Sequence, residues 1–230
     1  MKYIKFSLLP FLLFSLSVRL ISQVPAKIYD MVYGLDQTLY NGKKYNYYLP
    51  IGTKGHQYLV SPVYVAGSLT IKDQCYHDIS LNLDIFNQQL LLKYQDDKGA
   101  MNIIEVSKAW IKSFRMGNML FEYLEVEKNP RFFQVLGDSN IRILHYWRKN
   151  FDLEGSIGSY YYAFSAPLRD SFVFTDGKLK PFTTNRNFIR IFDPSLRPDI
   201  KSYLHKHKVR VTKASDQVMV DVLNFIGNLK

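Results

Sequence analysis

Three side chains in the stretch DQCYHDI have the types and spacing of metal ligands. Cys75 and His77 are two positions apart and Asp73 is two positions earlier, so a strand would present all three on one face. Thiolate, imidazole and carboxylate groups all bind zinc, but a zinc site needs a fourth ligand, and the sequence identifies none. The alternative is a small buried cysteine beside a polar histidine at a strand end. We therefore predict no metal ligand and no cofactor.

A second group, in SYLHKHKVRV, combines His205 and His207 with the cations Lys206, Lys208 and Arg210. Residues two positions apart on a helix point in different directions, so the two rings could share a metal only where the helix has already ended. Cations at a helix C-terminus complement the helix dipole and can bind its free carbonyl groups. We expect a helix end with a basic surface.

The sequence contains no motif for acyl or phosphoryl transfer. The stretch EGSIGSYYY places Ser156 and Ser159 beside glycines without the Gly-x-Ser-x-Gly spacing of a hydrolase elbow. The stretch GTKGHQ (52–57) lacks the P-loop spacing and predicts a hairpin loop. The paired acids of glycoside hydrolysis usually come from separate strands, so spacing distinguishes none of Asp84, Asp96, Asp97, Glu105, Glu122, Glu125 and Glu127. We expect Glu122, Glu125 and Glu127 to face solvent, and we predict no catalytic residue.

The first 22 residues have the pattern of a secretory signal peptide. Lys2 and Lys5 precede an uncharged run over 6–18, which Pro10 interrupts. This run is shorter than the ~20 residues of a membrane-spanning helix, so we expect no transmembrane helix in the mature chain. Cleavage is expected before Gln23, followed by export to the periplasm, to the outer membrane as an associated protein, or to the medium. No cysteine lies near this boundary, so we expect no lipid anchor there.

The composition predicts a globular chain with a basic surface. The formal charge of +10 in 230 residues becomes +7 once Lys2, Lys5 and Arg19 are removed with the signal peptide. Hydrophobic residues make up 47%, enough for a substantial core. Cys75 is the single cysteine, so the fold must be stable without an internal disulfide.

Residues 28–182 show the pattern of successive antiparallel strands, rich in Tyr, Phe, Val and Ile and divided by Gly, Asn and Asp turns. Leu81, Leu83 and Ile85 alternate with polar residues, which places them on one sheet face, and 87–89 predicts a turn into the next strand. Further hairpin turns are expected at 137–138 and 176–177. We predict a mainly β fold, an antiparallel meander rolled into a sandwich or a partly closed barrel.

The periodicity becomes helical after Thr184. A short helix is expected before Pro194, and a second has Pro198 in its first turn with Ile200, Tyr203 and Leu204 on one face. A last helix begins after Ser215, and its apolar stripe is Val218, Val222, Phe225, Ile226 and Leu229. The predicted organisation is a signal peptide (1–22), a β-rich domain (23–183) and a helical segment packed on it (184–230).

Basic and aromatic residues alternate in ILHYWRKNF, NRNFIRIF and YLHKHKVRV. In a cytoplasmic chain this pattern would favour nucleic acid, but export makes lipid phosphates, lipopolysaccharide or anionic glycans the better partner class. The alternative for each stretch is that the rings face the core and the cations face solvent. In GSYYYAFSAP, Tyr160 and Tyr162 share one strand face, and an exposed tyrosine would suit a protein interface or a sugar.

Several of these segments resemble an uncharacterised family of secreted or periplasmic proteins of Bacteroidetes-type bacteria. The segments are YDMVYG, YVAGSLTIKDQCYHDISLNLDIFNQQLLLKY, RFFQVLG, DSFVFTDGKLKPF and DIKSYLHKHKVRVTKASDQVMVDVLNFI. The resemblance implies a cell-envelope protein of a Gram-negative bacterium and brings no established activity with it. We expect a non-enzymatic binding or structural role in contact with another envelope protein or an anionic envelope surface, without nucleic acid. The alternatives are an extracytoplasmic hydrolase whose acids converge only in the fold, and a carrier of an apolar ligand within the rolled sheet.

Overall fold

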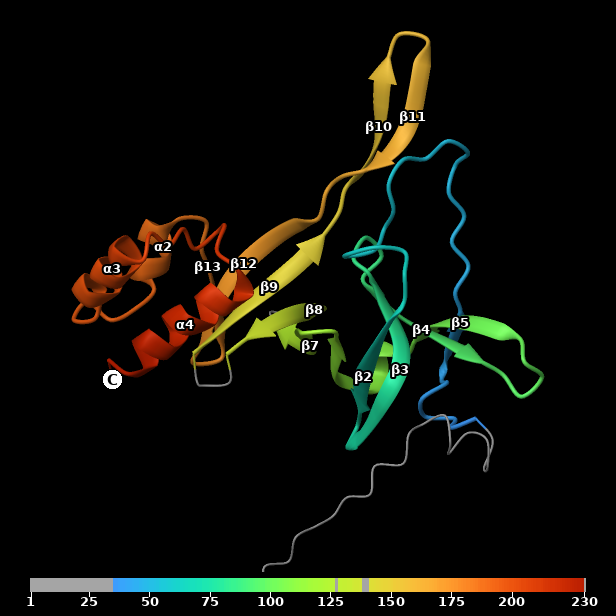
Figure 1. Ribbon diagram of the computed structural model, residues 1–230, viewed down its shortest axis with the longest axis horizontal. Coiled ribbons are helices and arrows are strands. Elements are labelled where there is room, and N and C mark those ends of the chain that lie inside the picture. The colour runs from blue at the N-terminus through green and yellow to red at the C-terminus, as the bar shows by residue number, and fades with distance from the viewer. Residues whose placement is uncertain (1–34, 127, 138–140, 230) are drawn as a thin grey trace, which may run out of the picture.

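The structure, a computed structural model, describes residues 35–126, 128–137 and 141–229. The predicted signal peptide lies outside the described residues. Antiparallel strands dominate and helices follow them near the C-terminus, which confirms the expected fold class (Figure 1). The sheet is not a closed barrel, because its two outer strands do not pair with each other.

Two antiparallel meanders, joined where β2 pairs with β6, form an eleven-stranded sheet in the described part of the chain. The first meander contains β1 (Gly42–Lys44), β2 (Val65–Ile71), β3 (Gln74–Asp84), β4 (Gln89–Gln95) and β5 (Met101–Val106). A short 3-10 helix, η1 (Lys108–Trp110), leads into the second. The second contains β6 (Ile111–Met116), β7 (Met119–Val126), β8 (Asn129–Leu136), β9 (Arg142–Arg148), β12 (Leu168–Thr175) and β13 (Lys178–Pro181). Between β9 and β12 the chain leaves the sheet as a separate hairpin of β10 (Phe151–Ser156) and β11 (Ser159–Phe164) (Figure 1).

Two of the predicted hairpins are confirmed within the described residues. The β3–β4 turn covers 85–88 where 87–89 was expected, and the β12–β13 turn has the predicted Asp176 and Gly177 at φ values of 51° and 71°. Two successive positive φ values produce the twist that suits a two-residue hairpin, and the Asp-Gly pair adopts them readily. The turn expected at Gly137-Asp138 connects β8 to β9, and residues 138–140 lie outside the described part of the chain.

A β-bulge changes the alternation of β3. The register against β2 shifts between Gly67 and Leu69, and Asp78 has a φ of 55°. As a result Tyr76 and Ile79 are both buried although they are three positions apart. Simple alternation would place these two residues on opposite faces of the sheet.

One core lies within the curve of the first meander and the beginning of the second. Phe114 on β6 and Phe121 on β7 stack there with ring centroids 4.8 Å apart. The core includes Leu69, Ile71, Leu81, Leu83, Ile85, Leu90, Leu92, Ile104, Val106, Phe114, Phe121 and Phe132. Leu81, Leu83 and Ile85 therefore do share one face, as their alternation predicted.

Three helices follow the last strand: α2 (Asn185–Arg190), α3 (Arg197–Lys206) and α4 (Asp216–Gly227). The predicted cap at Ser215 is confirmed, because its side chain accepts a hydrogen bond from the amide of Val218. The side chain of Thr184, which was not predicted as a cap, accepts one from the amide of Asn187. Pro198 lies in the first turn of α3, as expected. We call residues 183–229 the helical lobe.

The helical lobe packs on one face of β8, β9 and β12. Its core combines sheet residues with helix residues, namely Leu136, Ile143, Val173, Phe188, Ile200, Leu204, Met219, Val222 and Ile226. The predicted stripe of α4 needs one correction: Met219 is fully buried, whereas Val218 is 36% exposed. The two differ by about 100° around the helix, and the neighbouring sheet decides which of them points inward.

No helix in the described ranges combines the length and the hydrophobicity needed to cross a membrane.

Candidate functional site

The helical lobe carries most of the positive charge of the described chain. Residues 183–214 contain eight Lys or Arg and two Asp, a net +6, and Asp216 and Asp221 bring the whole lobe to +4; residues 35–182 contain seventeen Lys or Arg and fifteen Asp or Glu, a net +2. Within the described structure, no carboxylate lies within 4.0 Å of any of the eight cations. We call this surface the basic face; its exposed cations are Arg186, Arg190, Lys201, Lys206, Lys208, Arg210 and Lys213.

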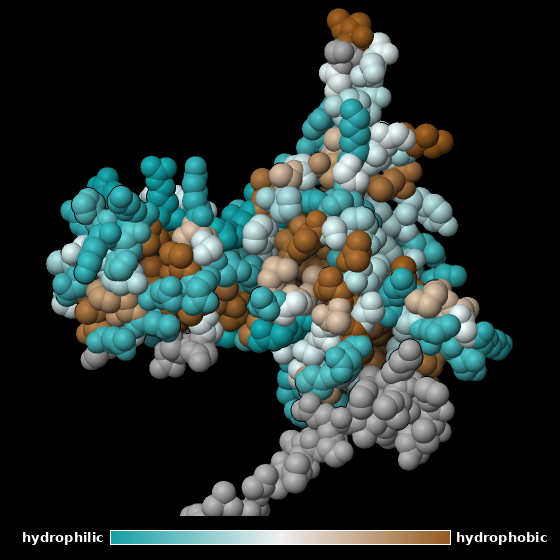
Figure 2. Space-filling view, in the orientation of Figure 1, coloured by the Kyte–Doolittle hydropathy of each residue, from teal (hydrophilic) through white to brown (hydrophobic). Residues whose placement is uncertain are grey.

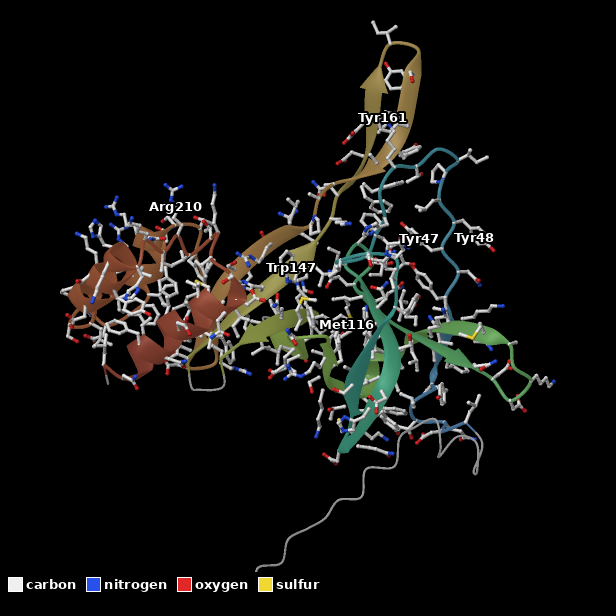
Figure 3. The ribbon with its side chains drawn as sticks, viewed as in Figure 1. Tyr47, Tyr48, Met116, Trp147, Tyr161 and Arg210 are labelled. Atoms are coloured by element: carbon white, nitrogen blue, oxygen red, sulfur yellow. The ribbon has the colours of Figure 1, made fainter. Side chains whose placement is uncertain are left out.

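The basic face brings together residues from two elements. The side chain of Asn185 donates to the carbonyl of Val209 at 2.7 Å and accepts from the amide of Val211 at 3.0 Å, so it fixes the segment after α3 beside the start of α2. Arg186 and Arg190 are one helical turn apart on α2, and Arg210 lies between the two residues that Asn185 binds. Figure 3 shows Arg210 on the outer side of the lobe.

Replacing Asn185 with alanine is expected to lower the free energy of unfolding by about 1–2 kcal/mol, because two partly buried backbone groups lose their partner. Asn187→Ala is the matched control, since the side-chain amide of Asn187 makes only a long, exposed contact of 3.4 Å with Thr183. Urea denaturation of both variants measures the difference. Equal losses would mean that Asn185 has no special role in holding the basic face.

The stretch SYLHKHKVRV forms the predicted helix end. α3 stops at Lys206, and Lys208 adopts a φ of 51°, while the amide of Val209 binds the carbonyl of Leu204 at 2.9 Å. His205 and His207 are both exposed, and the ring of His207 lies on Tyr203 with centroids 4.3 Å apart. The two imidazoles therefore belong to the surface of a helix terminus.

A polar chain fixes the lobe to the sheet. Gln134 on β8 donates to the carboxylate of Asp216 at 2.6 Å and accepts from the indole of Trp147 at 2.8 Å. Arg169 on β12 donates to the carbonyl of Thr212 at 2.9 Å. These contacts hold the beginning of α4 and the loop before it, and so fix the orientation of the basic face.

Beside this chain lies the buried imidazole of His145. The ring is 0% exposed, and its Nδ1 lies 3.0 Å from the hydroxyl of Ser171, while within the described structure its Nε2 has no partner. Burial, with the positive charge of Arg169 nearby, lowers the pKa of His145 to about 3. Ser171 is 8% exposed, so this serine–histidine pair is enclosed by the protein and fixes a neutral ring in the interior.

A buried carboxyl group organises the long irregular segment between β1 and β2. Asp84 is 0% exposed and accepts four hydrogen bonds, from the amides of Phe86 and Asn87, the side chain of Asn87 and the hydroxyl of Tyr45, at 2.8–3.0 Å. Gln57 donates to the same hydroxyl at 3.0 Å. Asp84 thus closes the β3–β4 turn and anchors residues 45–58 across it.

Burial also changes the titration of groups around Asp84. Desolvation raises the pKa of Tyr45 well above its usual value, so its phenol is the neutral donor to Asp84. Lys149 is only 8% exposed and donates to the carbonyl of His56 at 2.6 Å, and desolvation lowers its pKa. Burial and Lys149 together lower the pKa of His56. The cluster joins the 45–58 segment to the end of β9.

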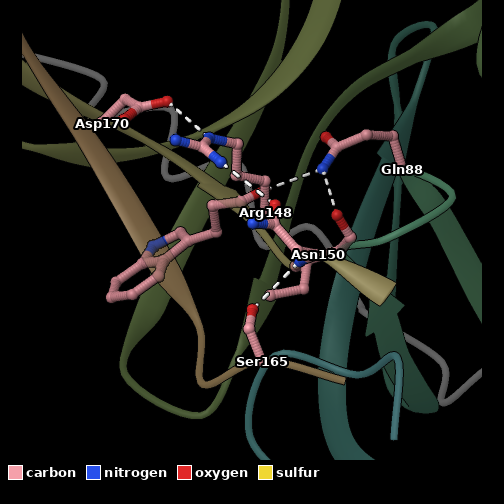
Figure 4. Close-up of polar contacts among 7 residues, drawn as sticks. Gln88, Arg148, Asn150, Ser165 and Asp170 are labelled. Atoms are coloured by element: carbon pink, nitrogen blue, oxygen red, sulfur yellow. Dashed lines mark hydrogen bonds and ion pairs between the residues drawn. The ribbon is translucent and has the colours of Figure 1, made fainter. Parts of the chain in front are cut away.

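The root of the β10–β11 hairpin is closed by polar contacts, which Figure 4 shows in part. Asn150 and Ser165 bind each other twice, from the amide of Asn150 to the hydroxyl and from the amide of Ser165 to the carbonyl, both at 3.0 Å. Arg148 forms an ion pair with Asp170 at 2.9 Å, and Gln88 donates to the carbonyl of Trp147 at 2.8 Å. The direction in which the hairpin leaves the sheet is therefore fixed.

Residues 46–54 run alongside this hairpin. The amide of Lys54 donates to the carbonyl of Tyr162 at 2.8 Å, the amide of Phe164 donates to the carbonyl of Lys54 at 3.0 Å, and the ammonium of Lys54 lies 3.7 Å from the ring centre of Tyr161. We call residues 46–54 and 151–164 together the prong. Its exposed apolar side chains are Tyr48, Leu49, Ile51, Leu153, Ile157, Tyr160 and Tyr162, and Figure 2 shows hydrophobic residues at its outer end.

Both outer strands of the sheet are poor sites for pairing with another chain. β1 and β13 have three and four residues, and they carry Lys43, Lys44, Lys178 and Lys180. Short strands with lysine side chains protect a sheet edge from strand addition. The basic face and the prong are consequently the two surfaces of the described chain best suited to contact a partner.

The predicted metal candidates do not form a ligand set. Cys75 is exposed, His77 is half-buried, and Asp73 pairs with Lys112 at 2.6 Å instead. Across the described residues, no three His, Cys, Asp or Glu side chains are placed to hold a metal ion.

The candidate acids lie apart and in different environments. Asp84 is buried, and Asp96 binds the amides of its own turn. Glu122 was expected to face solvent, but it pairs with Arg142 through both carboxylate oxygens at 2.8 and 2.9 Å, with 25% of its side chain exposed. Glu125 is exposed, and Glu127 lies outside the described residues.

The two serines and the segment 52–57, considered as catalytic and phosphate-binding candidates, lie in a hairpin and in a loop. Ser156 and Ser159 face each other in the register of the β10–β11 hairpin, next to its turn. The segment 52–57 was expected to be a hairpin loop; it is a loop, but it pairs with β11 through Lys54 instead of joining two strands. The sequence did not predict that residues 45–64 form a long irregular segment, because their tyrosines and valines are typical of a strand.

In the basic–aromatic stretches, most of the aromatic rings face the core and most of the cations face solvent, as the alternative to an anion-binding role predicted. Phe188 and Phe192 are buried while Arg186 and Arg190 are exposed, and in ILHYWRKNF the buried His145 and Lys149 are part of the interior. Tyr160 and Tyr162 share an exposed face and Tyr161 the other, as predicted. Sequence reasoning did not distinguish Asp84 from the other candidate acids and did not identify Tyr45 or Gln57, because no motif links the three residues.

Comparison with models of known families, with characterised proteins and with solved structures identified no match to this chain. Its function is therefore inferred from its own surfaces and buried groups.

Proposed function

We propose that this chain is an exported, non-enzymatic binding protein that contacts an anionic surface of the cell envelope through the basic face. The observation that supports this role is the net charge of +6 in residues 183–214, with no carboxylate within 4.0 Å of their cations in the described structure. Unpaired cations concentrated on a small unit produce a positive potential that attracts polyanions. The polar chain from Gln134 to Asp216 holds this face in a fixed orientation, so the cations act together.

The location in the envelope is part of the same proposal. It rests on Lys2, Lys5 and the uncharged run over 6–18, which have the pattern of an export signal. The resemblance to proteins of Bacteroidetes-type bacteria stays a prediction that agrees with this location. No observation on the described residues favours the hydrolase or the carrier over a binding role.

The experiment uses a soluble sulfated or phosphorylated polymer fixed to a resin. The wild-type protein is expected to bind at low ionic strength and to elute as salt rises, because exposed charges are screened beyond about 8 Å at 0.15 M salt. The triple variant Arg186→Gln, Arg190→Gln, Arg210→Gln is expected to bind about 100-fold more weakly, since each cation near an anionic surface contributes about 1 kcal/mol.

The matched control removes the same charge from another part of the molecule. Lys43→Gln, Lys44→Gln, Lys98→Gln lowers the net charge by three at exposed positions on β1 and in the β4–β5 turn. This variant is expected to elute near the salt concentration of the wild type. If both triple variants weaken binding equally, net charge alone is responsible, and the basic face is not the binding surface.

A further inference from the structure

The prong is exposed and uncharged over most of its length. Ile51 and Ile157 are 106% and 97% exposed, and Tyr48 is 90% exposed. The sequence has no Asp, Glu, Lys or Arg in 45–53 or in 155–168, although charged residues make up 22% of the chain. Exposed apolar residues without charges nearby usually mark a surface that a partner or a membrane covers.

The prong is also convex and rigidly assembled. Its two segments are separated by about a hundred residues in the sequence, yet two backbone hydrogen bonds and the contact of Lys54 with Tyr161 hold them together. The cluster around Asp84 anchors one segment, and the Asn150–Ser165 contacts fix the root of the other. Figure 1 shows the hairpin projecting beyond the sheet, with the 46–54 segment beside its root.

We propose that the prong inserts into the surface of a phospholipid bilayer, which is then the anionic surface that the basic face contacts. Ile157, at the tip of the hairpin beyond Glu154, enters the boundary between headgroups and acyl chains, and Tyr160 lies at headgroup level. Tyrosine suits this position, because its ring is apolar while its hydroxyl can bind water or headgroups. Single aliphatic side chains on a convex projection can dissolve in lipid without a complementary pocket, whereas a protein partner would have to supply one.

Charges limit and orient the insertion. Asp152 and Glu154 are exposed on β10, so only the hairpin beyond Glu154 can leave water at low cost. Figure 3 shows Arg210 on the same upper side of the molecule as the prong, marked by Tyr161. Anionic headgroups next to an inserted prong would attract the cations of the basic face, so apolar and electrostatic contacts would add. This assignment rests on the proposed function for its electrostatic part only.

The test is co-sedimentation of the full-length mature protein with vesicles of phosphatidylcholine and phosphatidylglycerol in a 7:3 ratio. Ile157→Ser is expected to lower the partition coefficient about tenfold, because this isoleucine side chain no longer leaves water. Val63→Ser is the matched control: this valine is 66% exposed but lies outside the prong, and partition should stay at the wild-type value.

A second measurement reports insertion directly. In Ile157→Trp, tryptophan emission is expected to shift to shorter wavelengths when vesicles are added, while Val63→Trp shows no such shift. Unchanged partition of Ile157→Ser, unchanged emission of Ile157→Trp, or a wild-type protein that stays in solution would each overturn the assignment to lipid. Retention of these same proteins on the polymer resin reports separately on the basic face, so failure of lipid insertion is distinguishable from failure of the proposed function.

Discussion

Asp84→Ala is expected to lower the free energy of unfolding by about 4 kcal/mol, one of the largest effects for a single substitution in this chain. The carboxyl group is fully buried, and its removal leaves two amides, the Asn87 side chain and the Tyr45 hydroxyl without their acceptor. Each buried polar group without a partner costs about 1–3 kcal/mol, although relaxation and water entry recover part of that. Denaturation in guanidinium chloride, compared with wild type, measures the loss.

Asp96→Ala is the matched control for this prediction. Asp96 also closes a hairpin turn, accepting from the amides of Lys98 and Ala100 and from the side chain of Asn102, but it lies at the surface, where water can replace it. The loss for Asp96→Ala should therefore be much smaller. A similar loss for both variants would show that turn closure, and not the buried connection to Tyr45, accounts for the contribution of Asp84.

The free energy of unfolding is expected to fall by about 2 kcal/mol between pH 7 and pH 5 through His145 alone. In the folded protein the pKa of this histidine is about 3, against the ordinary value of 6.5 for an exposed imidazole. Between these two values the unfolded chain binds the proton and the folded protein does not, so acid favours unfolding by about 1.36 kcal/mol per pH unit. The contribution of the neutral His145 to the free energy of unfolding is fully present above pH 6.5 and disappears progressively as the pH falls toward 3.

His145→Gln is expected to remove most of this pH dependence, whatever its effect on stability at pH 7, because glutamine has no proton to gain. His56→Gln is the control: the pKa of His56 is also lowered, but the residue is only partly buried. Carboxylates with lowered pKa values, such as Asp73 and Asp193, lose their contribution only at lower pH, so the range from 7 to 5 isolates the histidines. If the free energy of unfolding of His145→Gln changed with pH as steeply as that of the wild type, the prediction of a buried neutral ring would be contradicted.

Local patterns in the sequence predicted the elements well where a local interaction decides the structure. Ser215 caps a helix, Asp176 and Gly177 form a hairpin turn, and the helix with Leu204 on its buried face ends within the basic stretch, at Lys206. In each case neighbouring residues supply the hydrogen bond or the backbone preference. Val218 was wrongly predicted to lie on the buried stripe of α4. The sequence pattern does not separate it from its neighbour Met219, and packing against the sheet decides which of the two is buried.

The candidate site was less predictable. The alternation of Leu81, Leu83 and Ile85 indicated a polar opposite face, yet Asn82 and Asp84 are 2% and 0% exposed because the segment 45–63 covers them. Nothing within a few residues of Asp84 reveals that Tyr45 will reach it. The same holds for the prong, since Lys54 meets Tyr161 only after the whole second meander has formed.

The sequence by itself determined the antiparallel β class, the three helices and the net positive charge of the chain, since these follow from periodicity, capping residues and composition. The tertiary structure decided which charges remain unpaired, which polar residues are buried and which apolar residues stay exposed. Those properties depend on contacts between residues such as Gln134 and Asp216, or Lys54 and Tyr162, that are distant along the chain. These contacts form only when the sheet brings the segments together, so they contribute free energy only in the folded protein.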